Sequence, residues 1–137
     1  DFYTENGITP VSFEELLHRS EVLTLHLPKT QSTRGLYARG VLESMRPEAV
    51  LVNTCRGEIV DEEALAVRLE TGALRAACFD VFAVEPAEND RLLNLPNFLS
   101  TPHIGASTEE TRVAMAQAAL RGLEENEFVN PEKFYDN

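Results

Sequence analysis

The 137-residue sequence has no long hydrophobic run, because a charged or polar residue or a proline interrupts each apolar stretch after a few residues. A membrane-spanning helix needs about 20 consecutive apolar residues. Basic residues are scarce as well: 12 of them stand against 23 acidic ones, which gives a formal net charge of -11. Such a chain repels phosphate backbones and anionic lipid surfaces. The sequence therefore predicts neither a membrane protein nor a nucleic-acid-binding protein.

Cysteine is also scarce. Cys55 and Cys78 are the two cysteines, and their spacing matches neither a C-x-x-C pair nor a set of metal ligands. Small or apolar neighbours flank each of them, a setting typical of buried thiols. We therefore expect buried, reduced thiols and a cytoplasmic protein.

Several kinds of segment are missing. The N-terminus has no initiator methionine and no secretion signal, so we expect a fragment or a trimmed product. We find no repeat, linker, Gly-rich phosphate-binding loop, metal-ligand cluster or Ser nucleophile motif. The length predicts one domain over residues 1–137.

Short apolar segments alternate with helical patterns along the chain, which is typical of an α/β domain with a parallel sheet. Expected strands cover residues 22–27, 50–53, 73–79 and 98–100. Expected helices cover residues 13–19, 39–45 and 62–71, and a long helix is expected to begin at a capping box formed by Ser107 and Glu110.

Polar residues gather directly after three of the expected strands, in segments 53–57, 80–86 and 101–107. The carboxyl ends of parallel strands meet at one rim of the sheet, which is where open α/β sheets bind ligands. The topology therefore predicts a ligand site built from these three loops.

Two residues of these loops suit chemistry by themselves. Arg56 follows a buried strand and precedes Gly57, which leaves room for close approach, and its planar guanidinium suits a carboxylate. The alternative is a structural ion pair with Glu58 or Asp61. His103 suits proton transfer, because histidine titrates close to neutral pH, although a hydrogen-bonded loop histidine is the simpler interpretation.

Two acids, Asp80 and Glu85, stand in an otherwise apolar heptapeptide, where each is costly without a partner. We expect hydrogen-bond donors beside them, with a turn cap for Asp80 and a solvated side chain for Glu85 as the alternatives. Of the other histidines, His18 is predicted to lie on the surface and His26 to be packed within a strand.

Three segments in this order resemble the Arg, Glu and His signatures of the D-isomer-specific 2-hydroxyacid dehydrogenases, most closely those of the phosphoglycerate dehydrogenase type. They are Asn53–Asp61 (NTCRGEIVD), Asp80–Pro86 (DVFAVEP) and Thr101–Ser107 (TPHIGAS), and the similarity extends over about residues 7–131. The resemblance implies the second half of a Rossmann-like, doubly wound parallel sheet with flanking helices. The family's upstream Gly-rich loop and its substrate domain are absent from this chain, which makes residues 1–137 a partial NAD-binding domain.

The resemblance also implies a role for each matching position. Arg56 would bind the substrate carboxylate, His103 would be the general acid/base, and Glu85 would orient that imidazole. Asp80 would hydrogen-bond the nicotinamide carboxamide of NAD. The positions that would line the dinucleotide, besides Arg56, Asp80 and His103, are Leu27, Thr54, Cys55, Ile104, Gly105 and Ala106. The implied reaction is hydride transfer between NAD(H) and a small 2-keto or 2-hydroxy acid, without a metal.

Three other interpretations of the resemblance compete with this one: a formate dehydrogenase, a non-catalytic module, and a half-domain that pairs with another segment. Formate dehydrogenases resemble the pattern but carry Gln where Glu85 stands, which disfavours a formate enzyme. Transcriptional corepressors resemble the same triad, so a non-catalytic NAD-sensing or protein-binding module stays open. In the implied half-sheet the strand over residues 22–27 lacks one neighbour, and open edges recruit partners. We therefore expect a homo-oligomer such as a dimer, or pairing with an upstream segment.

Overall fold

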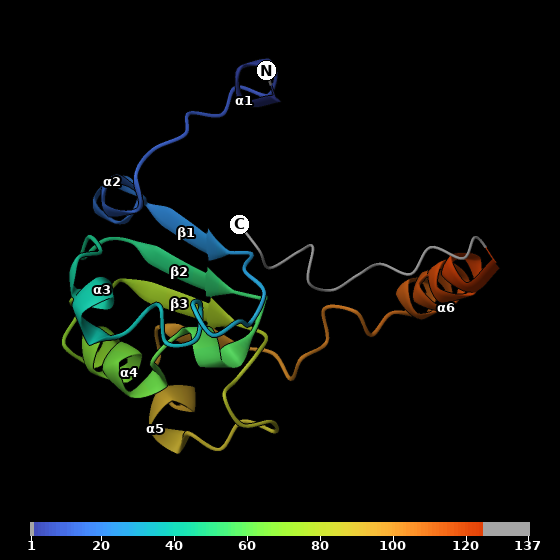
Figure 1. Cartoon of the computed structure of the whole chain (residues 1–137). Helices are drawn as coiled ribbons and strands as arrows, with labels where there is room; N and C mark the ends of the chain where they lie inside the picture. The colour runs from blue at the N-terminus through green and yellow to red at the C-terminus, as the bar shows by residue number, and fades with distance from the viewer. Residues whose placement is uncertain (1, 125–137) are drawn as a thin grey trace. The chain divides into compact units, whose positions relative to one another are not determined.

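The computed structural model describes residues 2–124, which divide into two compact units on either side of the bond between Pro102 and His103. The first unit contains a four-stranded parallel sheet in the order β1-β2-β3-β4. Its strands are β1 Val22–Leu25, β2 Val50–Asn53, β3 Ala76–Phe79 and β4 Phe98–Ser100. The arrows of β1, β2 and β3 point the same way in Figure 1. The predicted α/β class with a parallel sheet is confirmed.

The four strands end on one row across the sheet. Leu25 pairs with Asn53, Asn53 with Phe79, and Phe79 with Ser100. The loops that follow these strands therefore start at one rim, as the prediction of the ligand site requires.

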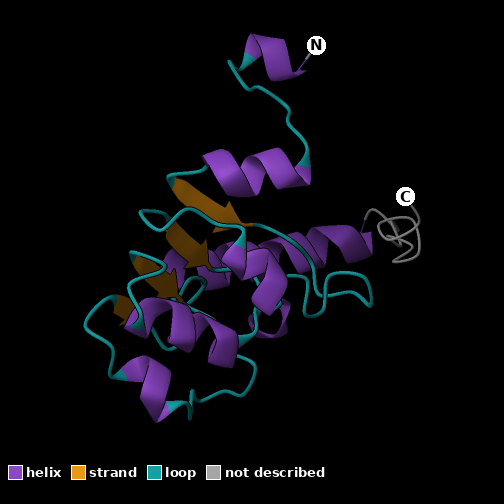
Figure 2. Ribbon diagram, turned by 90° about the vertical axis from the view of Figure 1, so that its left-hand side faces the viewer, coloured by secondary structure: helices purple, strands orange, loops and turns teal. Residues whose placement is uncertain are grey.

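Short helices accompany the sheet, and Figure 2 draws the helices in purple and the strands in orange. The first unit contains α1 Phe2–Glu5, α2 Phe13–Arg19, α3 Arg39–Glu43, the 3-10 helix η1 Gly57–Ile59, α4 Glu62–Glu70 and α5 Asp90–Leu93. The second unit contains α6 Glu109–Glu124. Within the first unit, α3 packs against α4 and α4 against α5, and the fully buried side chains include Leu51 of β2 and Leu65 of α4. Every helix of the described residues is too short or too polar to cross a lipid bilayer.

Local signals in the sequence account for the helix ends. The Ser12 hydroxyl accepts the N–H of Glu15 at 3.1 Å where α2 begins. The Asp61 carboxylate accepts the N–H of Ala64 at 3.0 Å where α4 begins. Gly72 follows α4 with φ of 69°, the left-handed conformation that ends many helices. These caps account for the start of α2 and for both ends of α4.

The start of α6 differs from the prediction. Thr108, not Ser107, caps this helix: its hydroxyl accepts the N–H of Thr111 at 3.2 Å, and its carbonyl accepts the N–H of Arg112 at 3.0 Å. Serine and threonine are both good N-cap residues. Because Ser107 and Thr108 are neighbours, the sequence pattern placed the start of the helix one residue too early.

The prediction for His26 was wrong because β1 is shorter than the expected strand over residues 22–27. β1 ends at Leu25, and His26 is exposed beyond it with a ring nitrogen 3.0 Å from the Thr24 hydroxyl, so it is not packed in a strand. His18 is exposed on α2 as predicted. Cys55 and Cys78 are free thiols but only half-buried, so the expectation of buried thiols is met only in part.

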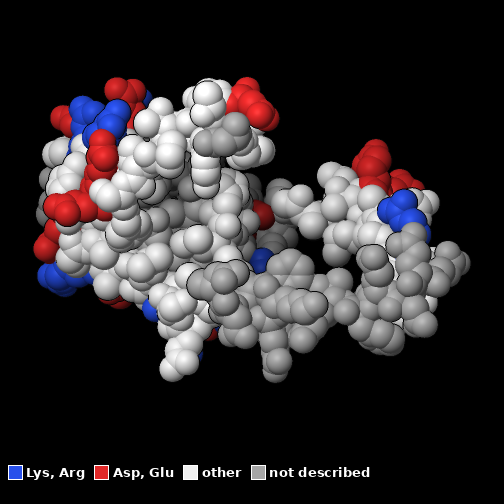
Figure 3. Space-filling model, turned by 45° about the horizontal axis from the view of Figure 1, so that its top comes forward, with Lys and Arg blue, Asp and Glu red and all other residues white. Residues whose placement is uncertain are grey.

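Within the described residues, β1 pairs with β2 alone, so its other edge is open. Apolar side chains are exposed beside this edge: Val22 of β1 is 61% exposed, and Phe13 and Leu16 of α2 are exposed as well. Figure 3 brings this side of the first unit forward and shows broad uncharged areas beside clusters of acidic and basic side chains. The open edge is therefore the one predicted for residues 22–27.

Candidate functional site

The loop after β2 is built around Asn53, which is fully buried. Its Oδ1 accepts both the N–H and the Sγ–H of Cys55 at 3.1 Å, and its Nδ2 donates to the carbonyl of Arg56 at 2.9 Å. The amide side chain of Asn53 thus holds the backbone at Cys55 and at Arg56 through hydrogen bonds, as in an Asx turn. The holding role of Asn53 was not predicted: Asn53 was expected only as the end of a strand and the start of the segment that resembles the family's Arg signature. The signal in the sequence that could have identified Asn53 is an amide side chain at the end of an otherwise apolar strand.

The side chain of Arg56 is exposed on this turn and makes no ion pair within the described residues, and its Nη1 donates to the carbonyl of Cys55 at 2.6 Å. The alternative partners are engaged elsewhere. Glu58 pairs with Arg34 at 2.8 Å, and Asp61 caps α4. The hypothesis of a structural ion pair for Arg56 is therefore wrong, and the guanidinium is available to an anionic ligand.

Gly57 is where the loop after β2 meets the loop after β3. A Cβ added at Gly57 would lie 1.9 Å from the backbone carbonyl of Phe82 and 2.4 Å from the amide nitrogen of Ala83. The room that the sequence analysis left at Gly57 is therefore occupied by the chain's own backbone. The turn that carries Arg56 and the loop that carries Glu85 therefore pack directly against each other at Gly57.

Asp80 joins three of the strand ends. It is 7% exposed, its N–H donates to the carbonyl of Asn53 at 3.0 Å, and its carboxylate accepts the hydroxyl of Thr101 at 2.5 Å. The prediction that Asp80 needs a nearby donor is confirmed. Thr101, which follows β4, holds the carboxylate of Asp80 at the rim, and Asn53, the last residue of β2, holds its backbone.

Two carboxylates hold consecutive amides of the loop after β3. Glu85 is exposed, and its Oε1 accepts the N–H of Phe82 at 3.0 Å. Glu62, from the first turn of α4, accepts the N–H of Ala83 at 2.7 Å. Sequence reasoning missed Glu62, because an acidic residue in a first helical turn is sufficiently explained by the helix dipole.

Burial, the largest cause, raises the pKa of Glu62, and the carboxylates of Glu63 and Asp61 raise it further, while the hydrogen bond from Ala83 opposes them. With a raised pKa, the folded chain binds this proton more tightly than the unfolded chain does. The contribution of Glu62 to the free energy of unfolding is therefore fully present at pH values below the usual pKa of glutamate. It is lost as the pH rises through the raised pKa. Ionisation of Glu62 therefore lowers the free energy of unfolding.

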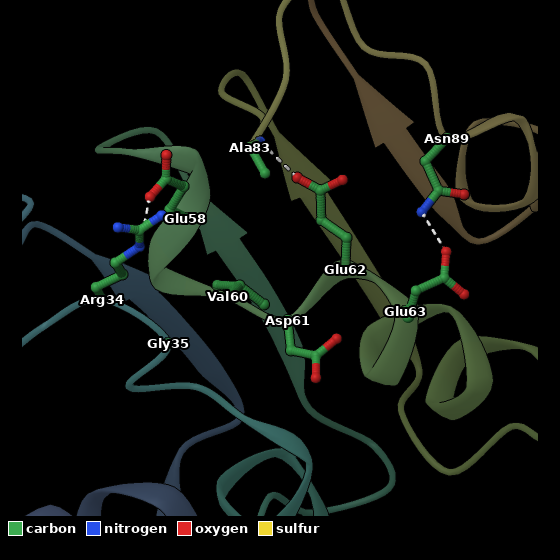
Figure 4. A pocket seen from close by; sticks show the side chains of 9 residues that line it. All are labelled: Arg34, Gly35, Glu58, Val60, Asp61, Glu62, Glu63, Ala83 and Asn89. Atoms are coloured by element: carbon green, nitrogen blue, oxygen red, sulfur yellow. Dashed lines mark hydrogen bonds and ion pairs between the residues drawn. The ribbon is translucent and has the colours of Figure 1, made fainter.

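A pocket of about 450 Å³ lies beside these residues. Figure 4 shows that Glu58, Asp61, Glu62 and Glu63 line it together with Ala83. Four carboxylates disfavour an anionic ligand, so the pocket does not suit a 2-keto acid. Among the described residues, no three His, Cys, Asp or Glu side chains are grouped to hold a metal ion.

Predicted cofactor-lining residues occur in both units. In the first unit, Thr54 is exposed directly after β2, and Leu27 and Cys55 are half-buried. In the second unit, Ile104, Gly105 and Ala106 are exposed, and the Ile104 carbonyl accepts the N–H of Ser107 at 2.9 Å. Contact of these residues with a dinucleotide stays a prediction.

His103 opens the second unit with an unusual backbone. It is exposed and has φ of 55°, in the left-handed region that residues other than glycine rarely occupy. Such outliers cluster at active sites and ligand clamps. The predicted orientation of His103 by Glu85 stays a prediction.

A family model described as D-isomer specific 2-hydroxyacid dehydrogenase, NAD binding domain, matches residues 2–105. The chain belongs to this family. The resemblance read from the three sequence segments is thereby confirmed, and so are the NAD cofactor class and the Rossmann-like fold class.

Enzymes of this family from several organisms are similar to the chain. The D-3-phosphoglycerate dehydrogenase of Mycobacterium leprae is 44% identical over 106 residues, which are 77% of this chain and 20% of the relative. The glyoxylate/hydroxypyruvate reductase B of Enterobacter agglomerans is 42% identical over 127 residues, covering 87% of this chain and 39% of the relative. The crystal structure of a glyoxylate reductase from Paecilomyes thermophila superposes with a TM-score of 0.88 at 36% identity, covering 97% of this chain and 42% of that one.

The chain thus spans 20% to 39% of the length of these two curated relatives. All three proteins are named as dehydrogenases or reductases, and the comparisons give no support to a non-catalytic module.

Proposed function

We propose that this chain is the C-terminal half of the NAD-binding domain of a longer enzyme, which transfers a hydride between NAD(H) and a 2-keto or 2-hydroxy acid. The observation that carries the proposal is Arg56, which lies on a turn that buried Asn53 holds at the rim. Its guanidinium is exposed and has no ion pair among the residues that the structure describes. Its forked donors suit a carboxylate, and the relatives are named for carboxylates: phosphoglycerate, glyoxylate and hydroxypyruvate.

The residues at the rim fit a nicotinamide. Asp80 offers a fixed carboxylate that can accept the N–H of a carboxamide, and half-buried Leu27 offers an apolar wall. The bound cofactor supplies or accepts the hydride. In reduction, Arg56 holds the substrate carboxylate and His103 protonates the forming alkoxide; in oxidation, His103 takes that proton back. Glu85 orients the imidazole.

Replacing Arg56 by lysine in the full-length protein tests this role. Lysine keeps the charge but cannot form two parallel hydrogen bonds to a carboxylate. We expect kcat/KM for the keto acid to fall at least about tenfold, which is about 1.4 kcal/mol. Steady-state NADH oxidation measures the change.

Arg34→Lys is the matched control, because Arg34 ion-pairs with Glu58 on the surface and such pairs contribute little. We expect its kinetics to equal those of the wild type. Wild-type kinetics in Arg56→Lys would remove Arg56 from the site.

We also propose a cytoplasmic protein that forms a homo-oligomer such as a dimer, or whose β1 edge pairs with an upstream segment. The free thiols of Cys55 and Cys78 support a reducing compartment, and the open β1 edge with exposed Val22 supports association. Sedimentation velocity of this chain should show species larger than a monomer. A single monomeric species with a sharp thermal transition would contradict association through the edge.

A further inference from the structure

We propose that Glu62 is a positioning residue for the reaction proposed above: its carboxylate holds the backbone of the loop that carries Glu85. The inference rests on the proposed function, because the role of Glu85 belongs to that reaction. Glu62 lies one residue beyond the segment that resembles the family's Arg signature. Its effect is indirect, since it contacts the loop and not the reacting groups.

The contact links α4 to a loop far away in the sequence. Glu62 is the first residue of α4, whose start the N-cap Asp61 fixes. From there the Glu62 carboxylate accepts the N–H of Ala83 at 2.7 Å across 21 residues of sequence, and Figure 4 shows the side chain reaching from the helix to the loop. Ala83 is exposed, so without Glu62 its amide would bond to water and the loop would lose this anchor.

The anchor reaches Glu85 through two consecutive peptide units, which meet at the Cα of Phe82. The peptide bond between Phe82 and Ala83 is planar, so fixing the N–H of Ala83 also restricts the carbonyl of Phe82. That carbonyl already packs against Gly57. The N–H of the same Phe82 donates to the Glu85 carboxylate at 3.0 Å. Glu62 and Gly57 therefore restrict one side of Phe82, the residue whose N–H on its other side binds the Glu85 carboxylate.

Asp80 does not depend on Glu62 in this way. Asn53 and Thr101 hold Asp80 through hydrogen bonds of their own. Loss of the Glu62 anchor should therefore impair the step that needs Glu85 more than the binding of cofactor. The expected signature is a lower kcat with a nearly unchanged KM for NADH.

Glu63 separates this role from a general effect of charge at the helix N-terminus. It stands next to Glu62 in the first turn of α4 and shares its interaction with the helix dipole. Its carboxylate bonds to Asn89 and Arg91 and not to the loop over residues 82–85. Glu63→Ala is therefore the matched control.

The test uses the full-length protein with NADH and glyoxylate. Glu62→Ala should lower kcat about tenfold, because misplacing a catalytic group by about 1 Å costs up to about 10²-fold, and should leave KM for NADH within about twofold. Glu62→Gln should restore kcat, since its amide oxygen can still accept the N–H of Ala83. Glu63→Ala should match the wild type.

Hydrogen exchange at the Ala83 amide, measured by NMR, reports on the anchor independently of turnover. We expect faster exchange in Glu62→Ala and wild-type exchange in Glu62→Gln and Glu63→Ala. Unchanged kcat in Glu62→Ala, or an equal loss in Glu62→Gln, would overturn the positioning role alone. Absence of turnover in the wild type would overturn the proposed function, and the positioning role with it.

Discussion

Replacing His103 by alanine is expected to lower kcat/KM for keto-acid reduction by about 10²- to 10⁴-fold in the full-length protein, the usual contribution of a general acid or base. In the proposed reaction the imidazole would deliver the proton to the forming alkoxide as hydride reaches the carbonyl carbon, whereas alanine would leave water as the proton donor. The left-handed backbone of His103 and its place in the family's His signature both support this role. Single-turnover oxidation of NADH would measure the loss.

His18→Ala is the matched control, because His18 is an exposed histidine on α2 whose Nδ1 lies 2.9 Å from the carbonyl of Glu14. We expect no change in turnover for this variant. A His103→Ala protein that keeps more than about a tenth of wild-type kcat/KM would exclude a general acid/base role.

Replacing Gly57 by alanine should destabilise this chain by about 1–3 kcal/mol or more, the usual range for a side chain forced into a filled space. The new Cβ would lie 1.9 Å from the carbonyl of Phe82. The obstacle is backbone, so no rotamer change relieves it, and the loop after β3 must move away from the turn that carries Arg56. Urea unfolding of the chain would measure the loss.

Gly40→Ala is the control for the loss of a glycine. Gly40 lies in α3, and a Cβ there would meet no atom within 4 Å. Alanine in a helix should leave stability unchanged or raise it by up to about 1 kcal/mol. Equal unfolding free energies for Gly57→Ala and the wild type would show that the two loops do not pack as described.

Elements with strong local signals could be predicted from the sequence. α2, β2 and β4 have the predicted bounds, because a cap or a short apolar run defines each of them within a few residues. η1 and α5 escaped prediction, since three or four residues carry no helical periodicity. Where two neighbouring residues were equally good caps, as at Ser107 and Thr108, the pattern could not choose between them.

The sequence by itself determined the parallel α/β fold and the rim at which polar loops follow the strands, and it predicted Arg56 as the residue suited to a carboxylate. Only the tertiary structure decided how that rim is held together. The Asn53 carbonyl accepts the N–H of Asp80, Gly57 makes room for the Phe82 backbone, and Glu62 binds Ala83. Local patterns report caps and strands because the interacting residues are neighbours. Contacts across more than 20 residues depend on how the loops pack, and no periodicity in the sequence records them.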